Sequence, residues 1–429
     1  MNNNLKNGLF MNNNEACVVT LKNISSIEGA DKIKQADVYL KDIKLTQVVV
    51  GVETKEDTKV VYFDSNICIN ECLTQDFPDL AKYLGKHNRV KTIKLKGIIS
   101  NGLCVDLDKF YKYFKNEKEA KSTLVEGYSF SKIREQDICK KYIVMVNEPS
   151  KSKKTKGKGK ISSRMIPGIF AFHCDTNQLL RNIHKINPDD IISISAKFHG
   201  SSSIVSNCLV KKKLNFKERI AKKLGVKVVE TEYDYIYASR RVIKNKEFPN
   251  SKSFYSEDIW AKSGRENFEG KLNKGETVYY EIVGFLENGK YIQKQYDYGC
   301  TSPNYKIVVY RITSTNIDGV VTEYSWSSMK ERCKELNVPM VKEYYYGKAK
   351  DLYPNISIEN HWQINFVEQL KKDFLEKKSA DCINDVPDEG IVIRRESISI
   401  DVYKLKSELF ILRESKLKDD EVEDIEDLN

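Results

Sequence analysis

Short runs of alternating or mostly apolar residues dominate the first quarter of the chain. Between residues 16 and 110 turn residues separate five such runs: ACVVTLKNI, QADVYL, KLTQVVVGV, TKVVYFD and GIISNGLCVDL. Several short β-type runs at this spacing are typical of a small sandwich or barrel. We therefore predict a β-domain over residues 16–110, preceded by a disordered stretch over residues 1–15.

The pattern becomes polar and rich in lysine from residue 111 to residue 165. It ends in KSKKTKGKGK, where six of ten residues are lysine. We predict an exposed linker here, which either contacts a phosphate backbone or serves as a solvated tether. A second basic stretch at 211–227 carries eight basic residues and one Glu. The helical spacing of Leu214, Ile220 and Leu224 predicts an amphipathic element with a basic outer face.

Residues 166–417 hold the remaining strand-like runs, and we expect them to form a second domain. Beyond it the chain turns acidic, with seven carboxylates in DDEVEDIED. Such a run is usually disordered, so residues 418–429 are expected to form an acidic tail.

Composition narrows the class of protein. A chain of 429 residues exceeds one ordinary core, so two or three domains are expected. Hydrophobic residues make up 40% and charged residues 31%, which favours globular protein over disordered polymer. The formal net charge of +10 favours association with polyanions such as nucleic acid or anionic lipid, although it also serves solubility alone.

Cysteine usage and the N-terminus indicate the compartment. Ten cysteines are scattered without CxxC pairs, which is typical of free thiols in a reducing compartment, and no zinc-type ligand set is expected. The N-terminus lacks the apolar core of a signal peptide, and no run of about 18 apolar residues occurs. We expect a soluble cytoplasmic protein with no membrane partner. Abundant Lys, Asn and Ile with nine prolines suggest an AT-rich genome, such as that of a phage.

A candidate nucleophile lies where an apolar strand ends. The run ISISA leads into Lys197-Phe198-His199-Gly200, followed by three serines. A lysine in such a seat is partly desolvated, which lowers its pKa so that the amine can attack. The pattern KxxG alone means little, because five other copies begin at Lys82, Lys94, Lys154, Lys156 and Lys222.

Further segments follow in order along the chain. They offer Ser239-Arg240 at a strand end, Glu281 amid apolar neighbours, Tyr310 within KIVVYRI, Glu389 on one strand, and Lys404 and Lys406 on the next strand. A charge in an apolar run is costly unless it binds something. Residues two apart in a strand share one face, so both lysines can reach one phosphate. Each segment alone also has an ordinary reading, as an edge-strand charge or one more lysine pair.

The series KFHG, SR, EIVG, EGIVIR and KLK resembles the nucleotidyltransferase motifs of the covalent ligase and capping-enzyme superfamily. KxHG followed by small hydroxyl residues is similar to the RNA ligase 2 type, whereas DNA ligases usually carry KxDG. The flanking FAFHCDTNQLL, YRITSTN and YKLKSELFILRESK resemble the branch with an N-terminal OB domain, typified by Deinococcus and Naegleria RNA ligases. The likeness covers residues 16–418.

The resemblance implies an α+β fold: an N-terminal OB-type β-barrel, then an adenylyltransferase (ATP-grasp-like ligase) domain of antiparallel sheets with flanking helices. It implies that Lys197 is the nucleophile and that Glu389 holds Mg²⁺ or Mn²⁺. The nucleotide-binding residues that it implies are Ala196, His199, Gly200, Glu281 at the ribose, Tyr310 stacked on adenine, and Lys404 and Lys406 at the ATP phosphates. Ser239 and Arg240 would meet phosphate on the nucleotide or the RNA.

The implied activity is ATP-dependent joining of RNA 3′-hydroxyl and 5′-phosphate ends through a lysyl-AMP intermediate, in a monomer that repairs RNA, including nicked duplexes. DNA ligases and capping enzymes normally carry another OB domain after the KLK motif, where this chain has an acidic run. The N-terminal barrel is expected to clamp the strands beside the break. A DNA ligase, a capping guanylyltransferase and a non-catalytic RNA- or tRNA-binding OB protein remain the alternatives.

Overall fold

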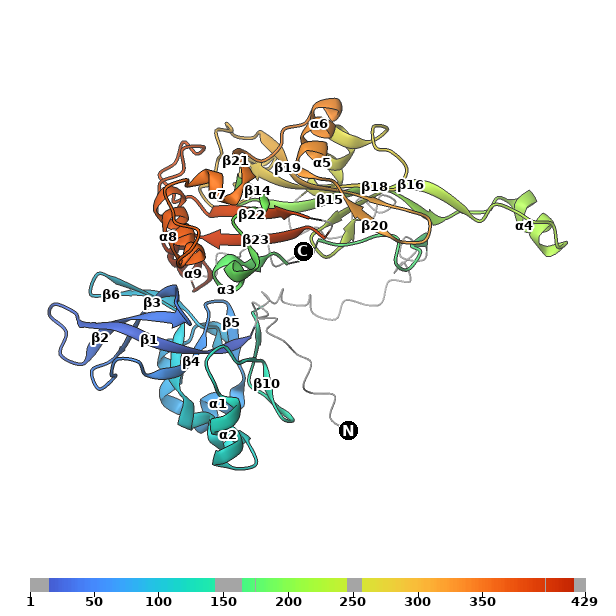
Figure 1. Ribbon diagram of the computed structural model, residues 1–429. Coiled ribbons are helices and arrows are strands. Elements are labelled where there is room, and N and C mark those ends of the chain that lie inside the picture. The colour runs from blue at the N-terminus through green and yellow to red at the C-terminus, as the bar shows by residue number, and fades with distance from the viewer. Residues whose placement is uncertain (1–14, 143–163, 174, 245–256, 398, 420–429) are drawn as a thin grey trace.

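The computed structural model describes residues 15–142, 164–173, 175–244, 257–397 and 399–419. Two units pack against each other, and Figure 1 shows the N-terminal unit in blue and teal below the larger one. Three predicted segments fall wholly or mostly outside the described ranges: the disordered stretch at 1–15, apart from Glu15, the lysine run at 151–160, and the acidic tail beyond residue 419. Within the described part of the chain, no helix combines the length and the apolar character needed to cross a membrane.

The N-terminal unit is built on an antiparallel sheet with the order β3-β2-β1-β4-β8, in which β9 also pairs with β1. These strands are β1 (Ala16–Ser26), β2 (Ile33–Leu40), β3 (Ile43–Gly51), β4 (Lys59–Phe63), β8 (Leu103–Asp106) and β9 (Ser129–Phe130). Two-stranded pairs surround the sheet: β5 (Ile67–Ile69) with β12 (Cys139–Lys141), β6 (Thr92–Leu95) with β7 (Ile98–Asn101), and β10 (Lys132–Ile133) with β11 (Gln136–Asp137). Strands lie where the sequence predicted a β-domain, and its closure into an OB-type barrel stays a prediction.

This unit extends past the boundary predicted at residue 110. The helices α1 (Glu71–Asp76) and α2 (Glu117–Thr123) flank it, and short 3-10 turns lie at Pro78–Tyr83, Lys86–Asn88 and Leu107–Tyr113. Leu124, Phe130 and Ile133 are buried in the same core as Val61 and Phe63. Residues 111–142 are therefore part of the folded unit and not the start of a linker. The strands in this stretch are only two or three residues long, too short for a period of alternation to emerge.

The larger unit contains two sheets that face each other. The five-stranded sheet has the order β13 (Asn177–Gln178), β23 (Asp401–Lys406), β22 (Gly390–Glu396), β14 (Ile191–Ala196) and β21 (Glu343–Lys348). The six-stranded sheet has the order β17 (Ile243–Lys244), β16 (Thr231–Ser239), β15 (Ser201–Lys211), β18 (Glu276–Gly284), β19 (Tyr305–Thr315) and β20 (Val321–Glu323). All neighbours are antiparallel except β13 and β23.

Helices cover these sheets and bury their apolar faces. The helices are α3 (Leu179–Asn182), α5 (Ile259–Phe268), α6 (Trp326–Leu336), α7 (Ala349–Leu352), α8 (Trp362–Phe374) and α9 (Glu408–Asp419), with a 3-10 turn at Ile183–Lys185. Trp260 of α5 and Trp326 of α6 belong to the core of the six-stranded sheet. Phe366 of α8 packs with Ile192 and Ile194 of β14 on the other sheet. The expected α+β class with antiparallel sheets and flanking helices is confirmed.

Helix α9 joins the two units. The guanidinium of Arg89, buried in the N-terminal unit, donates to the carbonyl of Ser415 at 3.2 Å and pairs with Asp419 at 2.6 Å. The hydroxyl of Thr46 donates to Glu408 at 2.6 Å. Residues 418 and 419, expected to open the acidic tail, are the last two residues of this helix, and residues 420–429 lie outside the described ranges.

A long arm projects from the body at the far right of Figure 1. Strands β15 and β16 run out of the six-stranded sheet as a pair and carry helix α4 (Phe216–Lys223) at their tip. The amphipathic element predicted at 211–227 is thus a helix. Its apolar residues do not pack on the body, however, because Phe216 and Leu224 are 76% and 75% exposed.

Candidate active site

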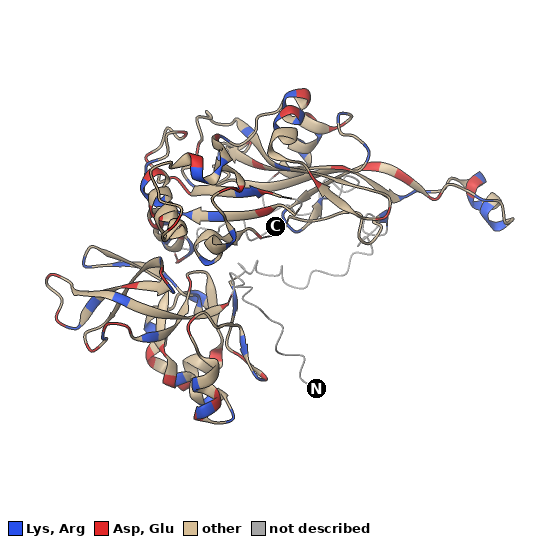
Figure 2. Ribbon diagram, in the orientation of Figure 1, with Lys and Arg blue, Asp and Glu red and all other residues tan. Residues whose placement is uncertain are grey.

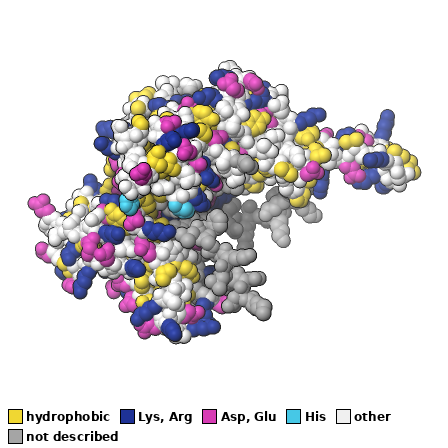
Figure 3. All heavy atoms as spheres, in the orientation of Figure 1, with side chains coloured by type: hydrophobic (Ala, Val, Ile, Leu, Met, Phe, Trp, Pro, Cys, Tyr) yellow, Lys and Arg dark blue, Asp and Glu magenta, His cyan; other side chains and the backbone are white. Residues whose placement is uncertain are grey.

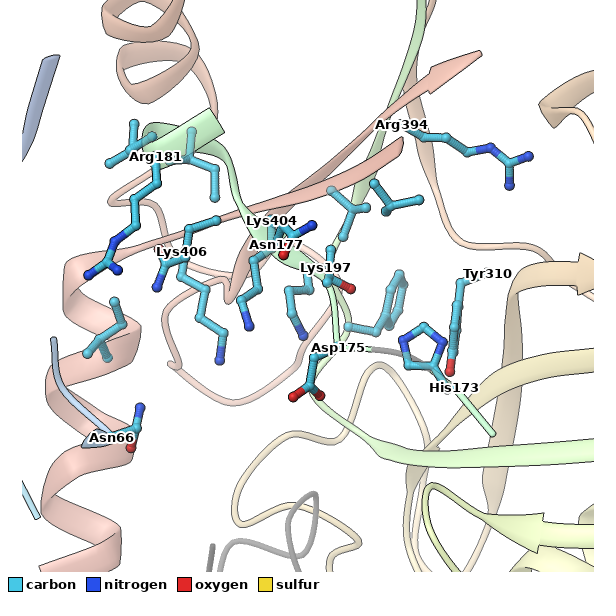
Figure 4. A pocket seen from close by; sticks show the side chains of 18 of the residues that line it. Asn66, His173, Asp175, Asn177, Arg181, Lys197, Tyr310, Arg394, Lys404 and Lys406 are labelled. Carbon is cyan, nitrogen blue, oxygen red and sulfur yellow. The ribbon is translucent and has the colours of Figure 1, made fainter. Parts of the chain in front are cut away.

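A cavity of about 420 Å³ lies between the two facing sheets and reaches the N-terminal unit (Figure 4). Seven of the residues predicted to form the site line it: Ala196, Lys197, Arg240, Glu281, Tyr310, Lys404 and Lys406. They come from both sheets, and β14 is separated from β23 by more than 200 residues of chain. The fold therefore brings segments far apart in the sequence to one place.

Lys197 directly follows β14 and is fixed by its backbone. Its amide donates to the carbonyl of Gly390 at 3.0 Å, and the amide of Ala196 donates to the carbonyl of Lys342 at 2.9 Å. The side chain is 17% exposed, and its Nζ lies 2.7 Å from Oε1 of Glu389. The predicted seat at a strand end is thus present, with a buried carboxylate as the partner of the amine.

Glu389 lies behind the cavity, between two lysines that line it. Its Oε1 is 2.7 Å from Nζ of Lys197 and 2.8 Å from Nζ of Lys406, and its side chain is fully buried. The next residue, Gly390, has a φ of +132°, and a Cβ there would lie 2.1 Å from the carbonyl oxygen of Leu405. A side chain at 390 would push β23 away. The glycine therefore keeps the carboxylate of Glu389 close to the lysines of β23.

The two lysines of β23 face the cavity together. Lys404 is opposite Val392 and Lys406 is opposite Gly390, both of which belong to β22. Burial lowers the pKa of Lys404 to about 8, and the positive charges of Lys406 and Lys197 contribute in the same direction. Figure 4 shows the three lysine side chains side by side. A cluster of cations this close is stabilised by a polyanionic ligand, and phosphate groups suit it.

The opposite wall carries Glu281 and Tyr310. Glu281 of β18 is 9% exposed, and the hydroxyl of Tyr310 lies 2.9 Å from Oγ of Ser202. The same strand holds a second buried acid, Glu276, which pairs with Arg332 at 2.8 Å outside the cavity. Glu276 thus has a structural partner, whereas Glu281 lines the space in which a ligand fits.

Comparison with known proteins bears on the fold. Neither a protein-family model nor a curated protein matches the chain. Among solved structures, a mutant of Naegleria gruberi RNA ligase with AMP and Mn matches with a TM-score of 0.59 and 18% identity, covering 94% of this chain and 99% of that one. This chain has the fold of that RNA ligase. Another mutant, with ATP and Mn, gives 0.58 and 19% over 94% and 99%, and the ligase with PPi gives 0.56 and 18% over 94% and 98%.

Four predicted site residues do not line the cavity: Glu389, which contacts two of the lining lysines from behind, and His199, Gly200 and Ser239. The ring of His199 packs between Tyr296 and Phe410, each 4.9 Å away, and its Nδ1 lies 4.0 Å from Glu389. A Cβ at Gly200 would lie 2.6 Å from the carbonyl oxygen of Ile282, so this glycine permits the close approach of β15 and β18. Ser239 bonds within a turn through Val242 and places the neighbouring Arg240.

Several cavity residues were missed by sequence reasoning, including Lys141, His173, Asp175, Arg181 and Arg394. Asp175 forms ion pairs with Lys141 of the N-terminal unit at 2.6 Å and with Arg240 at 2.5 Å. Burial alone would raise the pKa of Asp175, but these two cations outweigh it and hold that pKa below its usual range. FAFHCDTNQLL contains His173 and Asp175, but it was noted only as flanking sequence.

His173 stands edge-on to Tyr310, with ring centroids 5.2 Å apart. Burial lowers the pKa of His173 to about 3, and the nearby charges of Arg240 and Arg311 act in the same direction. The imidazole is therefore neutral at physiological pH, so it adds hydrogen-bonding capacity beside Tyr310 without adding to the cationic charge.

The residues present also fit a divalent cation, which the resemblance implies. Among the residues that the structure describes, no three His, Cys, Asp or Glu side chains gather as a ready-made metal cage. Mg²⁺ and similar ions are commonly bound by one or two carboxylates, with water and substrate phosphates as the other ligands. Glu389 is a buried carboxylate that contacts Lys406, one of the lysines expected to bind phosphate. It can therefore supply the single carboxylate that this kind of metal binding needs.

Proposed function

We propose that this chain is an ATP-dependent RNA ligase that joins 3′-hydroxyl and 5′-phosphate RNA ends through AMP bound covalently to Lys197. One observation carries the proposal: a strand-end lysine and two further lysines line one cavity of about 420 Å³, and a buried carboxylate behind them contacts two of the three. The fold shared with Naegleria gruberi RNA ligase, whose structures include ATP, AMP and PPi, supports it. Incubation with ATP and RNA ends tests it: joined RNA should form with ATP and not without it.

The chain's own residues account for the nucleotide step. Lys197 attacks the α-phosphorus of ATP, pyrophosphate leaves, and AMP remains on Nζ. Lys404 and Lys406 bind the phosphates and stabilise the negative charge that gathers on their oxygens. Glu281 meets the ribose and Tyr310 stacks on the adenine. The AMP then moves to the RNA 5′-phosphate, and attack by the 3′-hydroxyl releases it.

Glu389 would hold the metal ion. When bound, Mg²⁺ or Mn²⁺ supplies positive charge at this carboxylate, where it competes with the ion pair to Lys197 and favours the neutral amine. Before the metal ion binds, the carboxylate of Glu389 holds Nζ of Lys197 in place, with its Oε1 2.7 Å from Nζ.

The RNA substrate is inferred and distinguishes this proposal from a DNA ligase or a capping enzyme on the same core. Sealing assays on nicked duplexes, with ribose or deoxyribose at the 3′ end, distinguish an RNA ligase from a DNA ligase. Competition between ATP and GTP for covalent labelling separates a ligase from a guanylyltransferase. A non-catalytic RNA-binding protein would show no added mass of AMP after incubation with ATP.

ATP binding should weaken as the pH rises above 8. Lys404 has a pKa of about 8 in the free protein, so above that pH it must take up a proton before it can pair with phosphate. The affinity is fully present below pH 8 and should fall by up to about tenfold per pH unit above it. Calorimetry in buffers of different ionisation enthalpy would measure the proton uptake. Lys404→Met should bind ATP more weakly at pH 7 and lose the uptake; an unchanged uptake in this variant would assign the proton to another group.

The N-terminal unit should take part in the nucleotide step, because Lys141 reaches the shared cavity from β12. Lys141→Ala is expected to slow adenylate formation by about tenfold, since a positive charge that lines the cavity and pairs with Asp175 is lost. Sealing of a substrate that already carries AMP should change less. The adjacent Lys140→Ala is the matched control, because that side chain is exposed and does not line the cavity. Equal rates in both variants would limit this unit to the RNA clamp predicted from the sequence.

A further inference from the structure

The projecting arm starts at the candidate active site. Strands β15 and β16 pair from Ser203 opposite Ser239 to Lys211 opposite Thr231. Ser202 and Arg240, which flank the first of these pairs, both line the cavity. The eight residue-to-residue steps from Ser203 to Lys211 span about 27 Å of strand. Helix α4 therefore lies at least that far along the arm from the cavity, a distance of about one turn of a nucleic-acid duplex.

The tip of the arm is strongly basic. Residues 211–230 include eight Lys and Arg and two Glu. Both glutamates are paired at the tip: Glu218 with Lys212 at 2.5 Å and Glu230 with Lys222 at 2.6 Å. Lys217, Lys223 and Lys227 are exposed, and Figure 2 shows basic residues on α4 at the end of the arm. The tip thus carries an excess of six positive charges, which is complementary to a polyanion.

Apolar side chains lie among these charges. Phe216, Ile220 and Leu224 follow one another at helical spacing and are 76%, 42% and 75% exposed. Val226 and Val229, just after the helix, are 57% and 70% exposed. Figure 3 shows hydrophobic and basic side chains next to each other on the arm. An exposed apolar row of this kind marks a surface that meets a partner.

The tip is held in shape by its own contacts. Asn215 caps α4, accepting from the amide of Glu218 at 2.9 Å, while Glu218 accepts from the amide of Asn215 at 2.8 Å. The ion pair of Lys222 with Glu230 ties the helix to the returning strand. A helix this short is marginal without such support. The tip therefore presents an ordered basic and apolar surface, and Arg164 supports the strands at its base through Glu232 and Asp234.

We propose that the tip of the arm binds RNA duplex about one helical turn away from the break. The exposed lysines contact backbone phosphates, and the row of Phe216, Ile220 and Leu224 lies on the wide, shallow minor groove of the A-form duplex. This inference rests on the proposed function, because the strands of the arm continue into residues that line the cavity proposed as the active site. That origin favours the substrate RNA over a membrane or an unrelated protein as the occupant.

The test compares the parent protein with a triple variant, Lys217→Gln, Lys223→Gln and Lys227→Gln, which keeps the helix cap and both ion pairs. The control is Lys271→Gln, Lys290→Gln and Lys334→Gln, which removes the same charge from exposed positions on the body. Equilibrium binding is measured on nicked RNA duplexes with flanks of about 20 or about 6 base pairs, which reach or fall short of one turn. The dependence on salt is recorded for each.

The arm variant should bind the long duplex at least about tenfold more weakly than the control variant, with a slope against log salt shallower by about 2 to 3. Binding of the short duplex and formation of the protein adenylate should match the parent. Equal losses on long and short duplexes, or no loss on either, would overturn the role of the arm. So would binding by the arm to anionic lipid vesicles with unchanged RNA affinity. The proposed function is judged separately, by adenylate formation, which the arm does not touch.

Discussion

Replacing Lys197 by Ala is expected to abolish transfer of AMP from ATP to the protein. The amine is the proposed nucleophile, whereas Lys404 and Lys406 belong to a different strand and are proposed to bind phosphate. Loss of a nucleophile usually costs far more than loss of a binding contact, so labelling should fall by more than about three orders of magnitude. Label on the α-phosphate of ATP, followed into the protein band, measures it.

The chain provides its own controls for this variant. Lys82 and Lys94 begin the same KxxG pattern as Lys197 but are exposed residues of the N-terminal unit. Lys82→Ala and Lys94→Ala should therefore be labelled like the parent. Covalent AMP that persisted in Lys197→Ala, or disappeared in either control, would show that the nucleophile is a different residue.

The central part of the candidate site followed from strand logic alone. Lys197 was placed at a strand end, and Lys404 and Lys406 were placed on one strand face, because both inferences need only local periodicity. Their convergence on Glu389 and Glu281 was expected from the family resemblance, and the structure brings four of the five to one cavity and Glu389 to the lysines that line it. The roles of these side chains in catalysis remain proposals.

Residues that the tertiary fold alone brings to the cavity could not be found in this way. Lys141 reaches the site from β12, a strand of three residues in a stretch assigned to a linker. Asp175 lies in a segment with no periodic pattern, and only its ion pairs with Lys141 and Arg240 reveal its place. Such contacts depend on how two units pack, which no local signal in the sequence reports.

Two patterns had the same appearance in the sequence and different outcomes. Glu276 and Glu281 are both acids within one apolar strand, yet Glu276 forms an ion pair with Arg332 and Glu281 lines the cavity.

The helical spacing at 211–227 indicated an amphipathic helix, and amphipathic helices usually bury their apolar side. Here the flanking strands carry the helix away from the body, so its apolar row stays exposed.

Replacing Glu389 by Gln should separate nucleotide binding from catalysis. The neutral amide keeps the size of the side chain but removes the negative charge from between Lys197 and Lys406. The cavity then becomes more positive, so the affinity for ATP should be equal or higher. Adenylate formation at saturating ATP should nevertheless fall by at least about a hundredfold, because the group proposed to hold the metal ion is lost. Rapid-quench measurement of the labelled protein, with ATP varied, gives both quantities.

A structural cost accompanies this change and has to be distinguished from the catalytic one. Two ammonium groups would lose their shared carboxylate, which should reduce the free energy of unfolding by up to about 3 kcal/mol. Glu276→Gln is the matched control, because it removes another buried, ion-paired carboxylate, the partner of Arg332, away from the cavity. It should lower the melting temperature in a similar way and leave the adenylation rate of the folded protein near that of the parent. If Glu389→Gln lost stability but kept its adenylation rate, its carboxylate would serve only to hold the two lysines in place.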